Sequence, residues 1–427
     1  MALASPACCR TAAQCTPRIP PLLAQDRVPP ADPCASAIAT ALQDTNHKES
    51  GRVFAYTARP FLIRLYSTTP LRASTPNMFS YHIAASFIAK DHPFHPTTHV
   101  YHFDPKVKRK INPSRSRAAN RAGRPESGHD AFFVSQVNGT GSVAFGVADG
   151  VGGWVDSGVD PADFSHGLCN YMAEAAQTHE DDEPGRQLTA RNLLQTGYDA
   201  VCRDTSVRAG GSTACVAVAR PDGTVDIANL GDSGFIHLRL NAVHGVSEPQ
   251  THAFNTPFQL SLIPPRMAER MSTYGGMQLC DLPRDADVSE HDLRHGDILL
   301  FATDGVLDNL FNQDILRVAS RVMVGAGAWE MTENKGVRVS DKLFDLCELQ
   351  SAGGDGTNRV SLQSVLVTQL VAAAKRASIN TRLDGPFAKE VQRYYPDENW
   401  RGGKVDDICV VAAVVCQDDI KPEKSKL

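Results

Sequence analysis

The sequence predicts a layered α/β sandwich with largely antiparallel sheets, and two observations support this fold class. Short runs rich in Val, Ile, Ala and Phe, which are typical of buried strands, alternate with longer stretches of helical period. Several strand runs are joined by Gly-Asp or Asp-Gly turns, which suit hairpins better than the long crossovers of a parallel sheet. An antiparallel sandwich is therefore favoured over a doubly wound parallel sheet.

Each expected element rests on a local pattern. An Asp160-Pro161 pair supplies an N-cap and a proline at the first helical position, so a helix should begin there, and a second helix should contain Leu194 and Val201. Helical period also covers residues 314–323, 362–374 and 387–395. Strands are expected at the apolar runs 81–89, 131–134, 142–148, 213–220, 224–229, 234–240, 297–303 and 408–416.

The net charge of −5 is the sum of two unlike parts. Residues 1–77 carry eight basic and four acidic residues, against 35 and 44 in the rest, and residues 51–90 contain no acidic residue. This composition is typical of an organelle transit peptide, and Arg64-Leu65-Tyr66-Ser67 resembles a site for the mitochondrial processing protease. We expect a targeting leader at 1–77, cleaved near 66/67; a disordered N-terminal tail is the alternative.

The rest of the chain is expected to form one domain. It would cover residues 78–417, with a tail at 418–427. Residues 105–125 carry eight basic residues and no acidic one, without an apolar period, which predicts an exposed loop. Such a loop is either simply solvated or docks acidic or phosphorylated partners.

Composition excludes several classes of protein. The pI of about 6.3 argues against a nucleic-acid binder, and the absence of an apolar run of eighteen residues argues against a membrane span. Seven of the eleven cysteines lie outside the leader, without metal-ligand spacing or the density of a disulfide scaffold. We expect them to be reduced and mostly buried.

The most informative feature is that aspartates stand at the ends of apolar runs. Asp149 and Asp304 directly follow such runs, Asp406 with its neighbour Asp407 directly precedes another, and Asp130 precedes a fourth. A carboxylate beside buried apolar residues costs several kcal/mol unless it has a partner. Four such cases predict a shared cation, and oxygen ligands beside glycines suit Mg²⁺ or Mn²⁺.

Two such ions would support one particular chemistry. Ions about 3.5–4 Å apart can share a bridging water, lower its pKa and direct it at phosphorus. The result is phosphoester hydrolysis without a covalent intermediate. A single Asp-Gly pair is equally consistent with an ordinary turn, so the prediction rests on the combination.

Three competing motifs are weaker. Gly231-Asp232-Ser233-Gly234 looks like the nucleophile segment of a trypsin-type protease, but Gln14 stands where the histidine motif needs a base. Asp232 follows an apolar run and can join the other carboxylates. The glycines at 150–153 lack the lysine of a nucleotide-binding loop. Prolines interrupt the four histidines between residues 92 and 102, which argues against a zinc-binding helix.

Five segments, in order, resemble the motifs of metal-dependent protein phosphatases of type 2C. The Gly-Val-Gly-Gly-Trp version of the second motif resembles a mitochondrial subgroup, whose known members act in the matrix and bear on coenzyme Q biosynthesis. The resemblance covers about residues 81–416. The segments that carry it are Phe145-Gly146-Val147-Ala148-Asp149-Gly150-Val151-Gly152-Gly153-Trp154, Gly211-Ser212-Thr213-Ala214, Asn229-Leu230-Gly231-Asp232-Ser233, Phe301-Ala302-Thr303-Asp304-Gly305 and Asp406-Asp407-Ile408.

The resemblance implies a four-layer fold and a metal centre. Two antiparallel sheets would be flanked by helices, with two or three Mn²⁺ or Mg²⁺ ions between the sheets. Asp149 would bridge two ions, and Gly150 would bind one of them through its carbonyl. Asp304 and Asp406 would complete the shell of the second ion, and Asp232 would help to hold a third. Asp149, Asp304 and Asp406 are thus the implied catalytic residues, and Asp130 would act through water.

The same resemblance implies partners and a location. The domain at 78–417 would be catalytic and would act on phosphoserine and phosphothreonine of mitochondrial matrix proteins, including those of coenzyme Q biosynthesis. We expect a monomer that binds no nucleic acid and has no membrane span.

Three departures from the family pattern motivate a rival hypothesis. His129 stands where the family commonly has Glu, and Val151 stands where it often has the histidine that is a candidate general acid. Pro125 occupies the place of the phosphate-binding arginine, so Arg124 is the expected substitute. The rival is a catalytically weak or silent pseudophosphatase that binds phosphoproteins and regulates a partner.

Overall fold

The computed structural model describes residues 78–107, 121, 123–180, 187–273, 279–334, 336–352 and 358–418. The chain divides into two units, 1–71 and 72–427, and all described residues belong to the second. The expected leader, most of the basic loop at 105–125 and the tail from 419 onward lie outside the described residues.

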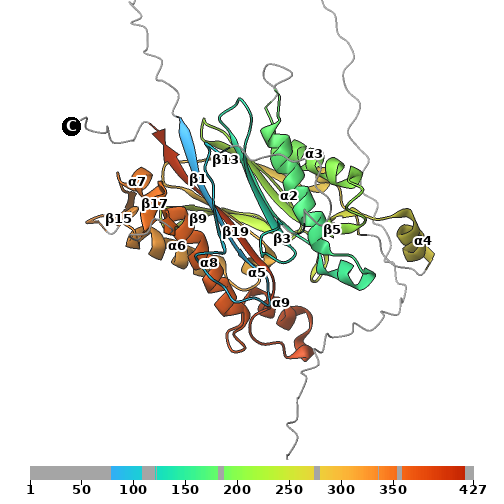
Figure 1. Cartoon of the computed structure of the whole chain (residues 1–427). Coiled ribbons are helices and arrows are strands. Elements are labelled where there is room, and N and C mark those ends of the chain that lie inside the picture. Colours follow the sequence, from blue (N-terminus) through green and yellow to red (C-terminus); the bar gives the residue numbers. More distant parts are fainter. Residues whose placement is uncertain are drawn as a thin grey trace, which may run out of the picture. The chain divides into compact units, whose positions relative to one another are not determined.

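Two antiparallel sheets form the centre of the described part of the chain (Figure 1). The six-stranded sheet has the order β2 (Val100–His102), β1 (Phe79–Ile88), β19 (Ile408–Gln417), β14 (Ile298–Ala302), β8 (Gly234–Arg239) and β9 (Ala242–Val246). The five-stranded sheet has the order β13 (Asp287–Asp292), β7 (Thr224–Leu230), β6 (Ala214–Ala219), β4 (Val143–Asp149) and β3 (Asp130–Gln136).

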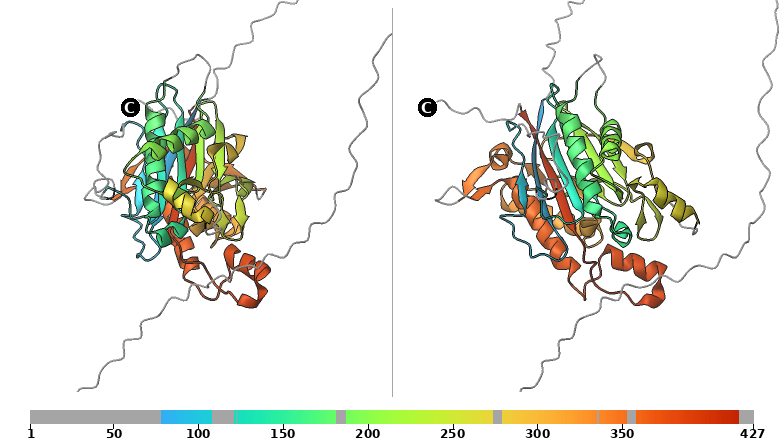
Figure 2. Two further views of the ribbon diagram at one scale, coloured as in Figure 1. Left: turned by 90° about the vertical axis from the view of Figure 1, so that its right-hand side faces the viewer. Right: turned by 45° about the vertical axis from the view of Figure 1, so that its right-hand side comes forward.

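Helices cover the outer face of each sheet (Figure 2). On the five-stranded sheet lie α2 (Pro161–Gln177) and α3 (Ala190–Arg203), and on the six-stranded sheet lie α6 (Asn312–Gly325) and α8 (Leu362–Ser378). The shorter helices are α4 (Pro265–Thr273), α5 (Asp304–Leu307), α7 (Leu343–Cys347) and α9 (Pro386–Tyr394), with 3-10 turns η1 (Gly152–Ser157), η2 (Pro283–Asp285) and η3 (Pro396–Glu398).

Four small pairs of strands complete the described structure. They are β5 (Gly210–Ser212) with β12 (Leu260–Leu262), β10 (Thr251–Ala253) with β11 (Thr256–Pro257), β15 (Trp329–Met331) with β16 (Val337–Val339), and β17 (Gln350–Ala352) with β18 (Asn358–Val360).

The alternation of side chains along β1 and β19 explains why the two sheets pack face to face. Ile83 and Phe87 of β1 point into the core between the sheets, whereas Ala84 and Ile88 face the helices. All residues of β19 except the last are buried, because one face meets the other sheet and the opposite face meets α8. A strand buried on both faces needs a continuous apolar run, which is how the sequence reads there.

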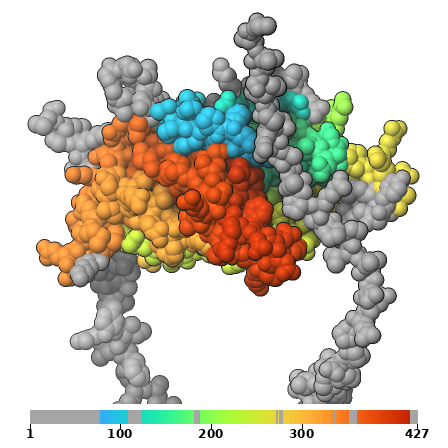
Figure 3. Space-filling view, turned by 90° about the horizontal axis from the view of Figure 1, so that it is seen from below, coloured from blue at the N-terminus to red at the C-terminus, as the bar shows by residue number. Residues whose placement is uncertain are grey.

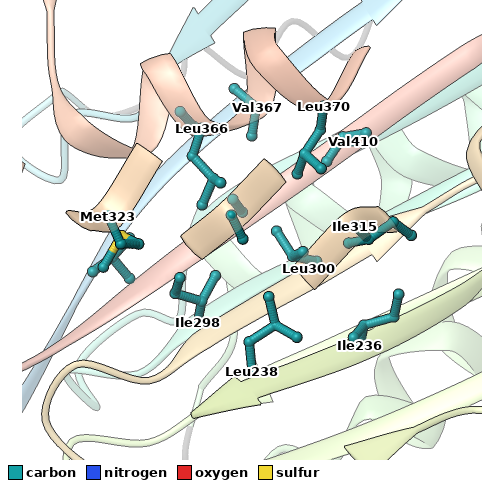
Figure 4. Close-up of a cluster of buried hydrophobic side chains, with 14 of the residues drawn as sticks. Ile236, Leu238, Ile298, Leu300, Ile315, Met323, Leu366, Val367, Leu370 and Val410 are labelled. Carbon is teal, nitrogen blue, oxygen red and sulfur yellow. The ribbon is translucent and has the colours of Figure 1, made fainter. Parts of the chain in front are cut away.

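Aromatic rings fill the middle of the space between the sheets. Phe301 of β14 lies edge-on to Phe145 of β4, with ring centroids 5.1 Å apart, and stacks with Phe235 of β8 at 6.0 Å. On the other face of the six-stranded sheet, Figure 4 shows Leu366 and Leu370 of α8 pointing toward the strands. The molecule therefore has three apolar layers between four layers of secondary structure.

The helix predicted at Asp160-Pro161 begins as the motif requires. The Asp160 side chain accepts a hydrogen bond from the Ala162 amide at 3.1 Å, and Pro161 is the first helical residue. Phe164, Leu168 and Met172, spaced by one turn, are fully buried against the five-stranded sheet. This helix is thereby fixed close to the ends of β3 and β4.

The predicted four-layer sandwich of antiparallel sheets and helices is confirmed. The eight expected strands and five expected helices are all present, with ends that shift by a few residues. The described cysteines are free thiols, five of them buried, as expected. No helix within the described residues combines the length and apolar character needed to cross a bilayer.

Candidate active site

The strand register brings the predicted carboxylates to one end of the sandwich. Asp130 and Asp149 lie directly opposite each other in the β3–β4 ladder. Asp304 follows the end of β14, and Asp406 precedes the start of β19. Because β14 and β19 are antiparallel neighbours, the end of one lies beside the start of the other. Asp232 follows β7 of the five-stranded sheet, so both sheets contribute carboxylates.

These carboxylates are close enough to perturb one another. Burial, and then the charges of Asp304 and Asp130, raises the pKa of Asp149 well above its usual range. Burial, and then the charge of Asp407, raises the pKa of Asp130 in the same way. The pKa of Asp406 is also raised, by burial and by Asp304. Like charges in a desolvated place favour protonation or the arrival of a cation.

Two buried carboxylate oxygens in this cluster have no hydrogen-bond partner. Asp130 accepts a hydrogen bond from the Thr303 hydroxyl at 2.7 Å through Oδ2, but its Oδ1 is buried and unpartnered. The Oδ1 atom of Asp232 is also buried and unpartnered, and burial together with Asp304 raises the pKa of Asp232 to about 8. Unsatisfied buried anionic oxygens are costly, and a bound cation would remove that cost.

Lys404 and Asp308, which the sequence analysis did not identify, complete the cluster. The Lys404 ammonium lies 2.5 Å from Asp304, 2.6 Å from Asp308 and 3.2 Å from Asp406. Burial lowers the pKa of Lys404, but these carboxylates outweigh it and raise that pKa well above its usual range. The ammonium also lies 5.1 Å from the centre of the Phe387 ring. Lys404 thus forms ion pairs with three carboxylates, whereas Asp130, Asp149 and Asp232 form no ion pair with Lys404.

Both residues carried a signal in the sequence. Asp308 lies four residues after Asp304, a spacing that places two side chains on one helical face. Lys404 lies two residues before Asp406, but a lysine near a chain turn is usually solvated. Its burial depends on the path of the chain after α9, which no local pattern reveals.

The backbone around Asp149-Gly150 is held by hydrogen bonds and close packing. The Asp149 carbonyl accepts from the Thr213 amide at 2.9 Å and from the Ser212 hydroxyl at 2.8 Å. A Cβ atom on Gly150 would lie 2.9 Å from the carbonyl oxygens of both His129 and Pro161. Only glycine fits there without moving the backbone, which explains the Asp-Gly pair as a packing requirement.

The adjacent residues Asp406 and Asp407 have different surroundings. Asp407 accepts hydrogen bonds from the backbone amides of Lys90 and His129, both at 2.8 Å, so it ties two loops together. The His129 imidazole lies beside it, with Nδ1 3.7 Å from Asp407 Oδ2. The histidine that replaces the family's glutamate therefore faces a carboxylate of the site.

Arg124 is engaged in ion pairs. Its guanidinium contacts Asp160 at 3.3 Å and also bonds the buried carboxylate of Asp163, which Arg121 contacts at 3.0 Å. These pairs fix the start of α2. The assignment of Arg124 as a phosphate ligand stays a prediction, and it would require the guanidinium to leave or share these carboxylates.

The donors suit a hard divalent ion, although the arrangement is not that of a loaded site. Carboxylate and carbonyl oxygens, two of them buried without partners, are the ligands that Mg²⁺ and Mn²⁺ prefer. As placed in the described part of the chain, no three His, Cys, Asp or Glu side chains could hold one ion together. To hold an ion, Asp304 and Asp406 would have to release Lys404.

Comparison with known proteins gives consistent matches. A family model described as protein phosphatase 2C matches residues 119–345. The protein phosphatase PTC7 homolog fig of Drosophila ananassae is 36% identical over 289 residues, which cover 67% of this chain and 73% of that protein. The mitochondrial protein phosphatase 2C homolog 7 of Saccharomyces cerevisiae is 31% identical over 293 residues, 68% of this chain and 75% of that protein.

Among solved structures, the photosystem II phosphatase PBCP is similar in fold. It is 24% identical, has a TM-score of 0.51, and the match covers 78% of this chain and 98% of that one. This likeness supports the architecture alone.

Proposed function

The chain belongs to the protein phosphatase 2C family, and from this premise we propose that it hydrolyses phosphoserine and phosphothreonine on mitochondrial proteins with Mn²⁺ or Mg²⁺. The observation that carries the proposal is the meeting of Asp149, Asp304 and Asp406 at one end of the sandwich, from strands of both sheets. Asp149 is the last residue of β4, and Asp304 and Asp406 each lie two residues from a strand, so the two sheets position these side chains.

The residues of the site would divide the work as follows. Asp149 would be shared between two ions, with the Gly150 carbonyl beside it, and Asp304 and Asp406 would hold one of them from the other sheet. Asp232 would contribute to a third position, and Asp130 would orient water through its unpartnered oxygen. When bound, the ions supply the Lewis acidity that activates water and polarises the phosphoryl group.

Lys404 would also take part in the reaction that we propose. With Asp304 and Asp406 assigned to the ions, Asp308, which lies 2.6 Å from the ammonium, would remain its partner. A cation held there can stabilise negative charge on the leaving oxygen. The raised pKa of Lys404 makes it a poor proton donor, so charge stabilisation, and not general acid catalysis, is the role we propose for it.

The mitochondrial location is supported by the composition of residues 1–77 and by the name of the yeast relative. Phosphoproteins of the matrix, those of coenzyme Q biosynthesis among them, are the substrates we propose.

Hydrolysis of an aryl phosphate by the full chain tests the chemistry. The wild type should be active with Mn²⁺ and inactive in chelator, and Asp149→Asn should lower kcat by a factor of about 10³ or more. Asp287→Asn, on the exposed edge strand β13, is the matched control and should behave as the wild type. Full activity of Asp149→Asn would refute the mechanism. Phosphopeptide binding without turnover at every metal concentration would support the silent, phosphoprotein-binding alternative.

A further inference from the structure

A cavity of about 590 Å³ adjoins the carboxylate cluster and has no assigned ligand. Four segments line it: residues 232–233, residues 246–249 and 251–255 around β10, residues 307–308 and 310–312 from α5 to the start of α6, and residues of α9. Asp232 and Asp308 belong both to its wall and to the cluster, so the cavity and the catalytic centre are continuous. A peptide whose phosphate reached the cluster would pass this cavity.

The charged side chains of the wall are of one sign. Glu248 and Glu390 are its exposed carboxylates, whereas Asp308 is already paired with Lys404 and Asp232 is a proposed metal ligand. No Lys or Arg is among the lining residues in the described part of the chain. His252 lines the wall as well, but its Nε2 is bonded to Asp281 at 2.9 Å. The unpartnered Oδ1 of Asp232 leaves one buried acceptor without a donor at this place.

The apolar part of the wall is largely aromatic. Phe254 of the β10–β11 hairpin packs against Phe387 and Tyr394 of α9, with ring centroids 5.5 and 5.4 Å apart. Phe311 and Tyr394 are exposed, by 42% and 55%, although both are large apolar side chains. In Figure 3 the orange-red atoms of the α9 region form a projecting knob, and Figure 1 places α9 at the same end of the sandwich as α5.

A wall that combines aromatic faces with carboxylates is suited to bind the long cationic side chains of arginine and lysine. Arginine and lysine have apolar stems that cover aromatic rings and a cationic head that seeks carboxylates. The structure already contains two contacts between a cation and an aromatic ring here: Lys404 lies 5.1 Å from the centre of the Phe387 ring, and Arg393 lies 5.5 Å from that of Tyr394. Neither side chain lines the cavity itself.

We propose that this cavity is a substrate subsite that binds an arginine or lysine close to the phosphorylated residue, so that the enzyme selects basic phosphopeptides. The inference rests on the proposed phosphatase function and specifies its substrate class. It follows from the sign of the wall, its aromatic faces and its continuity with the catalytic carboxylates.

A set of phosphoserine peptides tests this selection with the full chain. One arginine is placed in turn at each position within about four residues of the phosphoserine, a reach of about 14 Å in extended chain, in an otherwise alanine-rich sequence. At one position or more, kcat/KM should rise about fivefold or more over the all-alanine peptide, and glutamate there should lower it. The preference should shrink at high salt, since the outer carboxylates are partly exposed.

Charge-reversal variants assign the preference to the cavity. Glu390→Lys and Glu248→Lys should each reduce the ratio of kcat/KM between the arginine and alanine peptides, and the milder Glu390→Gln should reduce it less. Glu333→Lys, exposed near the β15–β16 hairpin and outside the cavity, is the control and should keep the wild-type ratio. No arginine preference at any position, or a preference that both cavity variants retain, would overturn the inference.

Binding separates this inference from the phosphatase proposal. Fluorescence anisotropy with labelled, unphosphorylated versions of the same peptides should show the same order of affinities, which Glu390→Lys should flatten. Hydrolysis of aryl phosphate without any charge preference would leave the function and refute the subsite. Absence of all hydrolysis, with the charge preference kept in binding, would refute the function and leave the subsite.

Discussion

Replacing Lys404 by methionine should destabilise the metal-free protein strongly and improve its metal binding. Methionine keeps much of the apolar stem against Phe387 but removes the only cation that pairs with Asp304, Asp308 and Asp406 among the described residues. Removing one partner of a buried ion pair typically costs about 3–5 kcal/mol, because the remaining charge is left uncompensated. We therefore expect the free energy of unfolding in chelator to fall by about that amount near pH 8.

The sign of the pH dependence follows from the pKa values. The pKa of Lys404 is raised in the folded state, so its stabilising charge is fully present below the unfolded pKa of about 10.4 and is lost only as pH rises through the higher folded pKa. Lowering the pH toward 5 protonates Asp308, whose pKa burial raises to about 7 despite the opposing charge of Lys404. The destabilisation by Lys404→Met should then be smaller than at pH 8.

Metal affinity supplies the decisive measurement. If the ammonium competes with the ion for Asp304 and Asp406, the lost stability of about 3–5 kcal/mol sets an upper limit on the gain in the free energy of metal binding. Every 1.4 kcal/mol corresponds to a tenfold change in Kd. Calorimetric titration with Mn²⁺ should show a Kd lower by about tenfold or more in Lys404→Met, and saturating Mn²⁺ should restore most of the lost stability. Lys389→Met removes an exposed ion pair and should change neither quantity appreciably. Weaker Mn²⁺ binding by Lys404→Met would refute competition and make the lysine an organiser of the site.

Three further results are expected. Between about pH 5 and 8 the free energy of unfolding of the metal-free protein should fall by several kcal/mol as pH rises. The reason is that burial raises the pKa values of Asp232 and Asp308 to about 8 and 7, so these residues hold protons in the folded state that the unfolded chain has released. Urea unfolding at fixed pH checks this, and a flat profile would contradict it. Gly150→Ala should lower Mn²⁺ affinity and kcat about tenfold or more, since its Cβ meets backbone oxygens at 2.9 Å; unchanged Mn²⁺ titration would show that the loop yields freely. Phe301→Ala should cost about 3–5 kcal/mol in unfolding free energy, and a loss below 1 kcal/mol would show that the layer between the sheets is not tightly packed.

The sequence predicted the elements that are buried on both faces. Residues 408–416 read as one apolar run because β19 lies between a sheet and a helix. The short strand pairs and α4, α5 and α7 were not predicted, because elements of two to nine residues are too short to show a clear hydrophobic period. Of the pairs, only β5 with β12 joins segments that are far apart in the sequence; the other three are local hairpins.

The candidate site was predictable to the extent that it lies at strand ends. Asp149 and Asp304 were found because a charged residue beside an apolar run is conspicuous. Lys404 and the ion pairs of Arg124 with Asp160 and Asp163 were not found, because each joins segments that are far apart in the sequence. Charge compensation is a property of the tertiary arrangement, and a linear pattern shows only which charges need it.

The two sheets each supply part of the carboxylate cluster, so the affinity for metal depends on the distance between the sheets. Phe145, Phe235 and Phe301 act as spacers that set the gap across which an ion would be held. A ligand or partner that increased the distance between the sheets, even by binding at the opposite end, would lower the affinity for metal without contacting a carboxylate. Conversely, a bound ion would link the two sheets, so metal binding should slow amide hydrogen exchange in both sheets together.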